Sequence, residues 1–259
     1  MTIVKLAEVF LLLTNSYIIY LVLVSDAYSV IDPEILNQGF DSMSVSDAMS
    51  RFDFKPRIGR DPYGTDWNRY CRSIGVHFYP TSDYSSGLAD YLKERCSEIV
   101  ENVEGAPRIL EAGAGRGRLS FLLNKSFNDL GLNVSILPVD NLSWRSPVGA
   151  LSISDNIDVI EALEHFKPNI VLTAWPPIID YEKWYRAFRN APSVLEHIFI
   201  GEPEQSMGTG ANTSVPPSVS SGFTQFELDG LTQESLCHFS TVYDMHPSRT
   251  IVFRRDPAQ

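Results

Sequence analysis

The spacing of hydrophobic positions along the chain predicts where helices and strands lie. From Ser86 to Val103, apolar residues recur three and four positions apart, which predicts an amphipathic helix. Gly105 ends this helix, and Pro107 prevents it from resuming. Beyond Pro107, short apolar runs alternate with further amphipathic stretches. Such an alternation is typical of strands separated by helices.

These segments predict an α/β fold with seven strands. The expected strands are Arg108–Ala112, Asn133–Val139, Ala150–Ile153, Ile170–Ala174, His197–Gly201, Leu236–Tyr243 and Thr250–Arg254. The expected helices between them are Arg118–Leu130, Ile157–Phe166 with Asp155 or Asn156 as its cap, and Tyr181–Arg189. Strands joined through helices pair in parallel, and right-handed crossovers place helices on both faces. The sheet is therefore expected to be doubly wound and mostly parallel. The run from Gly201 to Gly222 is too long for a routine connection and predicts a functional or disordered loop.

Residues 1–80 are expected to form a helical N-terminal extension or lid, and residues 81–259 the α/β domain. Ser46 to Phe52 predicts a short helix within the extension. Val9–Val24 is apolar except for Thr14, Asn15 and Ser16, and it is shorter than the span of about 20 residues that a bilayer needs. This favours a helix packed against protein, one suited to a homo-oligomer interface, over a membrane. A secretory signal and a membrane anchor are the alternatives.

The composition of the chain limits the kinds of partner that it is expected to bind. The chain has 259 residues and a formal net charge of −11. Nucleic-acid enzymes present a basic face to phosphates, so the charge argues against DNA or RNA and favours a small molecule or a protein. Cys71, Cys96 and Cys237 are odd in number and widely spaced, which predicts reduced, buried thiols in a cytoplasmic protein. No metal-ligand motif is expected.

The clearest candidate chemistry is a glycine-rich turn after the first expected strand. Glu111 to Gly117 reads Glu-Ala-Gly-Ala-Gly-Arg-Gly, between an apolar strand and an amphipathic helix. Glycines let the backbone adopt positive φ and approach a ligand closely, and the following helix points free N–H groups at the same place. The spacing differs from the Gly-x-Gly-x-x-Gly of dinucleotide folds. It resembles the first motif of the class I S-adenosylmethionine-dependent methyltransferases.

This resemblance implies a Rossmann-like methyltransferase fold with S-adenosylmethionine as the cofactor. The backbone of Gly113, Ala114, Gly115 and Gly117 would hold the methionine moiety, and Glu111 would contact its amino group, usually through water. Asp140 ends the second strand where the family places an acid for the ribose hydroxyls. The remaining cofactor candidates are Asn141 beside the adenine, Asp155 for its amino group, and Ala174. For Asp155, a helix cap is the competing interpretation.

The acceptor side is less defined. Thr173-Ala174-Trp175-Pro176-Pro177 lies where the family's fourth motif borders the transferable methyl. Amino-methylating branches carry a polar residue where this chain has Trp175, and an aromatic residue where it has Ile178, so the target atom stays open. Trp175 and Pro176 are candidate substrate contacts, with core packing as the alternative for the tryptophan. Tyr84 is a further substrate candidate, and Glu202, after the fifth strand, is the candidate catalytic acid.

No histidine lies in a recognisable base motif; His165 and His197 fall within expected elements and are predicted to be structural. Together with the acidic net charge, the resemblance implies a methyltransferase that acts on oxygen or nitrogen of a small molecule. The alternatives are a protein methyltransferase and a catalytically silent, methyltransferase-like scaffold or partner subunit.

Overall fold

The computed structural model describes residues 43–52, 79–103, 105–141, 156–176, 178–201, 222–231 and 249–256. Its elements in chain order are α3 (Val45–Arg51), α5 (Ser82–Asn102), β1 (Arg108–Ala112), α6 (Arg118–Asp129), β2 (Ser135–Val139), α7 (Val159–Phe166), β3 (Ile170–Ala174), α8 (Ile178–Asn190), β4 (Glu196–Gly201), β5 (Phe223–Glu227) and β6 (Arg249–Arg255). The α/β class and the alternation of strands and helices are as predicted.

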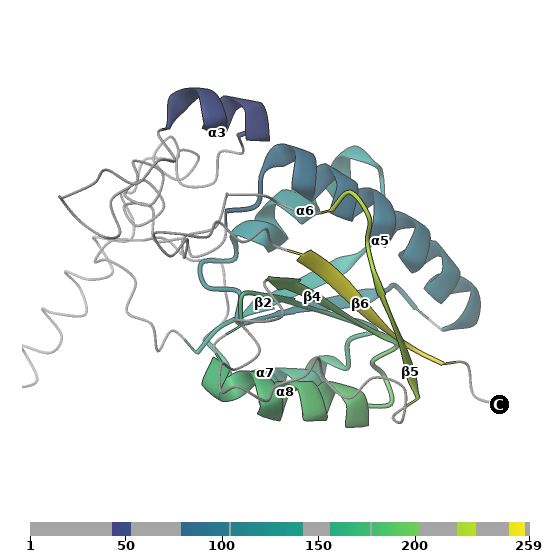
Figure 1. Ribbon diagram of the computed structural model, residues 1–259. Helices are drawn as coiled ribbons and strands as arrows, with labels where there is room; N and C mark the ends of the chain where they lie inside the picture. Colours follow the sequence, from purple (N-terminus) through teal and green to yellow (C-terminus); the bar gives the residue numbers. More distant parts are fainter. Residues whose placement is uncertain are drawn as a thin grey trace, which may run out of the picture. The chain divides into compact units, whose positions relative to one another are not determined.

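The strands form one sheet in the order β2-β1-β3-β4-β6-β5 (Figure 1). β1 pairs in parallel with β2 and with β3, and β3 pairs in parallel with β4. β6 runs antiparallel to both β4 and β5. β2 and β3 lie on opposite sides of β1, so the strand order reverses between β1 and β3. In sheets of this kind, ligands bind beyond the carboxyl ends of the strands at the point of reversal.

The prediction of seven strands is wrong for the part of the chain that the structure describes, where the sheet has six. The expected strands at 150–153 and 236–243 lie outside the described residues. β5 was not predicted, because its sequence Phe-Thr-Gln-Phe-Glu is polar in the middle and only Phe223 is fully buried. An edge strand needs to bury only one face, so its apolar signal is weak.

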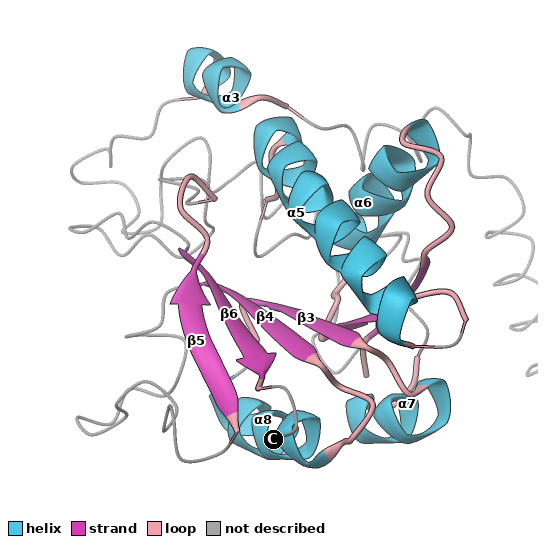
Figure 2. Cartoon of the chain, turned by 90° about the vertical axis from the view of Figure 1, so that its right-hand side faces the viewer, coloured by secondary structure: helices cyan, strands magenta, loops and turns pink. Residues whose placement is uncertain are grey.

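The two faces of the sheet are covered by different helix pairs. Figures 1 and 2 show α5 and α6 on one face and α7 and α8 on the other. Successive residues of β1 divide accordingly: Ile109 packs with the helices α5 and α6, and Leu110 packs with α7 and α8. The central strands β1, β3 and β4 are buried on both sides, which explains why they read as continuous apolar runs.

Two helices begin at other residues than the sequence predicts. α7 is capped by Asp158, whose side chain accepts a hydrogen bond from the Ile160 backbone N–H at 2.8 Å. The predicted cap, Asp155 or Asn156, is therefore wrong. Ile157 looked like the first residue of the apolar helix face, but the cap follows it. The short helix expected from residue 46 is present as α3, shifted by one residue.

Val9–Val24 lies outside the described residues, as does most of the predicted extension. Among the helices that the structure describes, none combines the length and the apolar character needed to cross a bilayer.

Candidate functional site

The glycine loop between β1 and α6 has the backbone conformation that its sequence predicts. Gly113, Gly115 and Gly117 have φ of 69°, 56° and 76°, in the left-handed region that side-chain-bearing residues disfavour. A Cβ added to Gly115 would meet no atom of the described residues within 4 Å. Glycine is therefore required there for its backbone angle, while the space beside it is open to a ligand.

Three hydrogen bonds fix the loop. The Ala114 N–H donates to the Val139 carbonyl at 2.9 Å, and the Gly117 N–H donates to the Ala114 carbonyl at 2.8 Å. The Gly115 N–H donates to Oδ2 of Asp140 at 2.8 Å. The structure thus brings the loop and Asp140, predicted separately from the sequence, together at one edge of the sheet.

Glu111 is buried at the end of β1, with 2% of its surface exposed. Its Oε2 accepts hydrogen bonds from the Ser120 backbone N–H at 3.0 Å and from the Ser120 hydroxyl at 2.5 Å. The N-cap residue of α6, Gly117, has no side chain to offer. Glu111 therefore satisfies one of the free N–H groups at the start of this helix.

The environment of Glu111 opposes its charge. Burial raises the pKa of this carboxyl to about 7, the Ser120 hydrogen bonds lower it, and the Asp140 charge raises it further. A carboxyl with such a pKa exchanges its proton near neutral pH, and acids with perturbed pKa values cluster at functional sites.

The end of β3 is strained. Trp175 has φ of 49°, which is costly for a bulky residue, and its N–H donates to the Ile200 carbonyl at 2.8 Å. Trp175 is half-buried and Pro176 is buried. Because β1 and β3 are parallel neighbours, Ala174, Trp175 and Pro176 lie at the same sheet edge as the glycine loop.

Other predicted site residues are distributed differently. Tyr84 is buried on α5 and its hydroxyl lies 2.5 Å from that of Thr250. The Thr250 hydroxyl donates to the Leu231 carbonyl at 2.7 Å, so Tyr84 is the donor to Thr250. Its polar atom is thus used inside the core, which gives the predicted substrate contact no support. Asn141 follows Asp140 and is exposed. Asp155 and Glu202 lie outside the described residues.

The two histidines that the structure describes lie away from the glycine loop. His197 is buried on β4, with its Nε2 2.9 Å from the Thr173 hydroxyl, and burial lowers its pKa to about 3. His165 is exposed on α7. His77, His238 and His246 lie outside the described residues.

Sequence reasoning missed two contacts near the loop. Ser120, the partner of Glu111, is the third residue of α6, where backbone N–H groups still lack helical partners. Arg118 is buried, with its guanidinium 4.2 Å from the centre of the Tyr79 ring. The position of Ser120 in the helix was a usable signal. The long-range pairing of Tyr79 with Arg118 left none.

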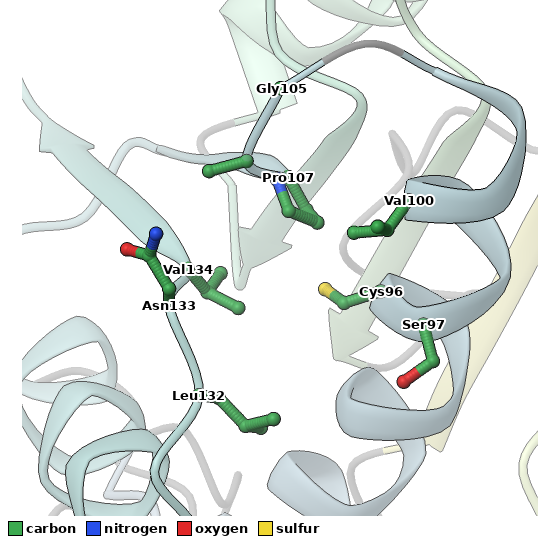
Figure 3. A pocket seen from close by; sticks show the side chains of 9 residues that line it. Cys96, Ser97, Val100, Gly105, Pro107, Leu132, Asn133 and Val134 are labelled. Atoms are coloured by element: carbon green, nitrogen blue, oxygen red, sulfur yellow. The ribbon is translucent and has the colours of Figure 1, made fainter.

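A hollow of about 350 Å³ lies at the opposite edge of the sheet, between α5 and the segments that lead into β1 and β2 (Figure 3). Its lining is mainly apolar and includes Cys96, Val100, Pro107 and Val134. Burial raises the pKa of the Cys96 thiol to about 12, so it stays protonated and unreactive at neutral pH. This hollow carries none of the predicted site residues.

Three solved structures, all named as methyltransferases, show what the chain is similar to. A SAM-dependent methyltransferase from Agrobacterium tumefaciens is 14% identical, with a TM-score of 0.36 over 71% of this chain and 64% of that one. The 23S rRNA methyltransferase ErmE is 16% identical, with a TM-score of 0.31 over 64% and 69% of the two chains. The third is 1,6-didemethyltoxoflavin-N1-methyltransferase from Burkholderia thailandensis, bound to 1,6-didemethyltoxoflavin and S-adenosylhomocysteine. It is 16% identical, with a TM-score of 0.31 over 79% and 95% of the two chains.

No protein-family model matches the chain, and no curated protein matches it. Likenesses with TM-scores of 0.31 to 0.36 do not define an activity, so the function proposed below depends on the geometry of the loop.

Proposed function

We propose that this chain is a class I S-adenosylmethionine-dependent methyltransferase. The observation that carries the proposal is the glycine loop, whose three left-handed glycines lie between the buried Glu111 and Asp140 at the reversal of strand order. Glycines in this conformation are costly for folding unless something approaches the backbone closely. An acid on each side of the loop suits a ligand with an ammonium group and vicinal hydroxyls.

The residues present fit this cofactor. The open space beside Gly115 admits the methionine moiety next to the loop backbone. Only one oxygen of Glu111 is hydrogen-bonded to Ser120, which leaves the other for the ammonium group. Asp140 would take the ribose hydroxyls, and Asn141 would border the adenine. When bound, the cofactor supplies an activated methyl group, and the protein's contribution is to align the acceptor with it.

For the acceptor we propose a small molecule that is methylated on oxygen or nitrogen. Trp175 and Pro176 would form a stiff wall poor in hydrogen-bond donors beside the methyl group, which suits a flat or apolar acceptor. The net charge of −11 disfavours a nucleic acid. A protein acceptor is the second possibility within the same chemistry.

A cofactor-binding partner subunit without activity is the second candidate function. It is favoured by the placement of His165 and His197, the two described histidines, away from the loop. A turnover assay separates the two functions. It measures the formation of S-adenosylhomocysteine from S-adenosylmethionine in the presence of a panel of small acceptors. An enzyme turns over with at least one acceptor class, whereas a partner subunit binds the cofactor without turnover.

Gly115→Val tests the proposal through calorimetric titration with S-adenosylhomocysteine. The branched side chain would fill the open space beside the loop, and we expect binding to be lost. Gly131→Val is the matched control, because Gly131 also has a positive φ, of 66°, and open surroundings, but lies outside the loop. Both variants carry similar backbone strain, of about 1–2 kcal/mol. Equal affinity of the folded Gly115→Val variant and the control would refute the assignment.

A further inference from the structure

Ser120 and Glu111 form an asymmetric contact. Both donors of Ser120, its backbone N–H and its hydroxyl, reach the same carboxylate oxygen, Oε2, at 3.0 Å and 2.5 Å. Among the described residues, none donates a hydrogen bond to Oε1. Glu111 is 2% exposed, and its Oε1 is not among the fully buried atoms that lack a partner, so this oxygen is the one open to water or to a ligand. A donor that a ligand brings to this oxygen of a largely buried carboxylate would add a charge-assisted hydrogen bond.

No cation of the described part of the chain pairs with Glu111. Its neighbours across the sheet, Pro138 on β2 and Leu172 on β3, are uncharged. At the end of β2, Asp140 repels it. Arg118, the first residue of α6, packs on the Tyr79 ring. Arg116 precedes the helix, and burial and then the positive charge of Arg118 lower its pKa. Within the described part of the chain, the charge of Glu111 is therefore not balanced by a cation.

We propose that Ser120 is a positioning residue for cofactor binding: it holds Glu111 by one oxygen, so that the second oxygen receives the ammonium group of the cofactor. The proposal rests on the function proposed above and assigns a task to a residue outside the glycine motif. Ser120 is fully buried on α6, so its hydroxyl has a fixed direction. Its hydrogen bonds favour the ionised carboxyl and thereby offset part of the effect of burial.

This arrangement makes binding depend on pH in a definite direction. Burial holds the pKa of Glu111 at about 7, so the carboxyl carries a proton below that pH and loses it above. An ammonium group prefers the ionised form. Affinity should therefore be greatest above pH 7 and fall by up to about tenfold per pH unit as the pH drops below it.

The experiment measures the dissociation constant of S-adenosylhomocysteine between pH 5.5 and 8.5 for the full chain and for variants at Ser120. Ser120→Ala removes a hydrogen bond to a charged group, so we expect the midpoint of the pH profile to rise by about one unit. Ser120→Thr keeps the hydroxyl and should restore the midpoint. Ser120→Cys, a weaker donor of similar size, should lie between them and serves if Ser120→Ala does not fold.

Two controls separate positioning from packing. Ser126→Ala makes the same exchange further along α6, at a residue without a contact to Glu111, and should leave the midpoint unchanged. Glu111→Gln should give a flat profile. An unshifted midpoint in Ser120→Ala, or in Ser120→Cys where Ser120→Ala does not fold, overturns the positioning role while leaving the proposed function intact. Absence of binding by the unmodified chain at every pH overturns both.

Discussion

Two buried glutamates at opposite edges of the sheet show how differently a protein can treat the same side chain. Glu196, at the amino end of β4, is fully buried and receives hydrogen bonds from Arg95 and Arg254, each at 2.9 Å, and from the Tyr91 hydroxyl at 2.8 Å. Glu111, at the carboxyl end of β1, has Ser120 as its one hydrogen-bonding partner among the described residues. Arginines balance the charge of Glu196, whereas no cation of the described residues pairs with Glu111.

The same edges differ in backbone strain. Lys167 and Trp175 are the two described non-glycine residues with positive φ, at 48° and 49°. Lys167 is exposed and ends α7 before β3 begins, a common use of this conformation. Trp175 is a bulky, half-buried residue after β3, beside the glycine loop. In the described part of the chain, the buried acid that no cation balances and the costly backbone of Trp175 therefore lie at one edge, a combination typical of functional sites.

The largest expected effect is on stability at Glu196. Glu196→Gln leaves Arg254 without its counter-charge and Arg95 with the exposed Glu98 as its remaining partner, and breaking a buried pair in this way costs about 3 kcal/mol. Cofactor affinity should not change. Glu182→Gln is the control, because Glu182 and its partner Arg186 are exposed and such pairs contribute at most about 1 kcal/mol. Urea unfolding measures both. A Glu196→Gln variant as stable as the control would mean that the network is dispensable.

Above neutral pH, Glu111→Gln should stabilise the folded protein, whereas Glu196→Gln destabilises it. In the folded protein the pKa of Glu111 is about 7, against 4.5 ordinarily, so the native state binds a proton between these values that the unfolded state has lost. Stability therefore falls as the pH rises through this window, by up to about 3 kcal/mol. Glutamine has no charge to bury and retains an acceptor for Ser120.

We therefore expect Glu111→Gln to unfold at higher urea than the unmodified chain at pH 8 and at the same urea at pH 4, while binding the cofactor more weakly. A variant destabilised at both pH values would show that the carboxyl is needed for folding.

The third prediction concerns Asp140. Asp140→Ala should weaken cofactor binding at least about tenfold, since a charge-assisted hydrogen bond contributes about 1.5–3 kcal/mol. Asp158→Ala is matched to it, because each carboxylate accepts one backbone N–H at 2.8 Å. Both variants should lose a similar, small amount of stability in thermal unfolding. If the two variants bind the cofactor equally well, Asp140 serves only to fasten the loop.

What could be predicted from sequence follows from how much of each element is buried. β1 and β3 were predicted to the residue, and β4 and β6 within two residues, because these strands are buried on both faces. β5 is buried mainly on one face, so its apolar signal is weak, and it was not predicted. The cap of α7 depends on the single side chain of Asp158, and it was also missed.

At the site, the glycine loop was predictable because glycine spacing is a local signal. The meeting of Asp140 with Gly115 was expected only from the resemblance. That both hydrogen bonds from Ser120 reach one oxygen of Glu111 depends on how the first turn of α6 lies against β1. The order of residues along the chain does not reveal this placement.

The central claim is that the uncompensated charge at the carboxyl edge belongs to a cofactor site. Calorimetric titration of S-adenosylhomocysteine into the full chain at pH 7, repeated in two buffers of different ionisation enthalpy, tests it most directly. Because burial raises the pKa of Glu111 to about 7, part of the population carries a proton at this pH, and we expect one molecule to bind with release of a fraction of a proton. Glu111→Gln should bind without releasing it. Binding without proton release by the unmodified chain, or no binding at all, would contradict the claim.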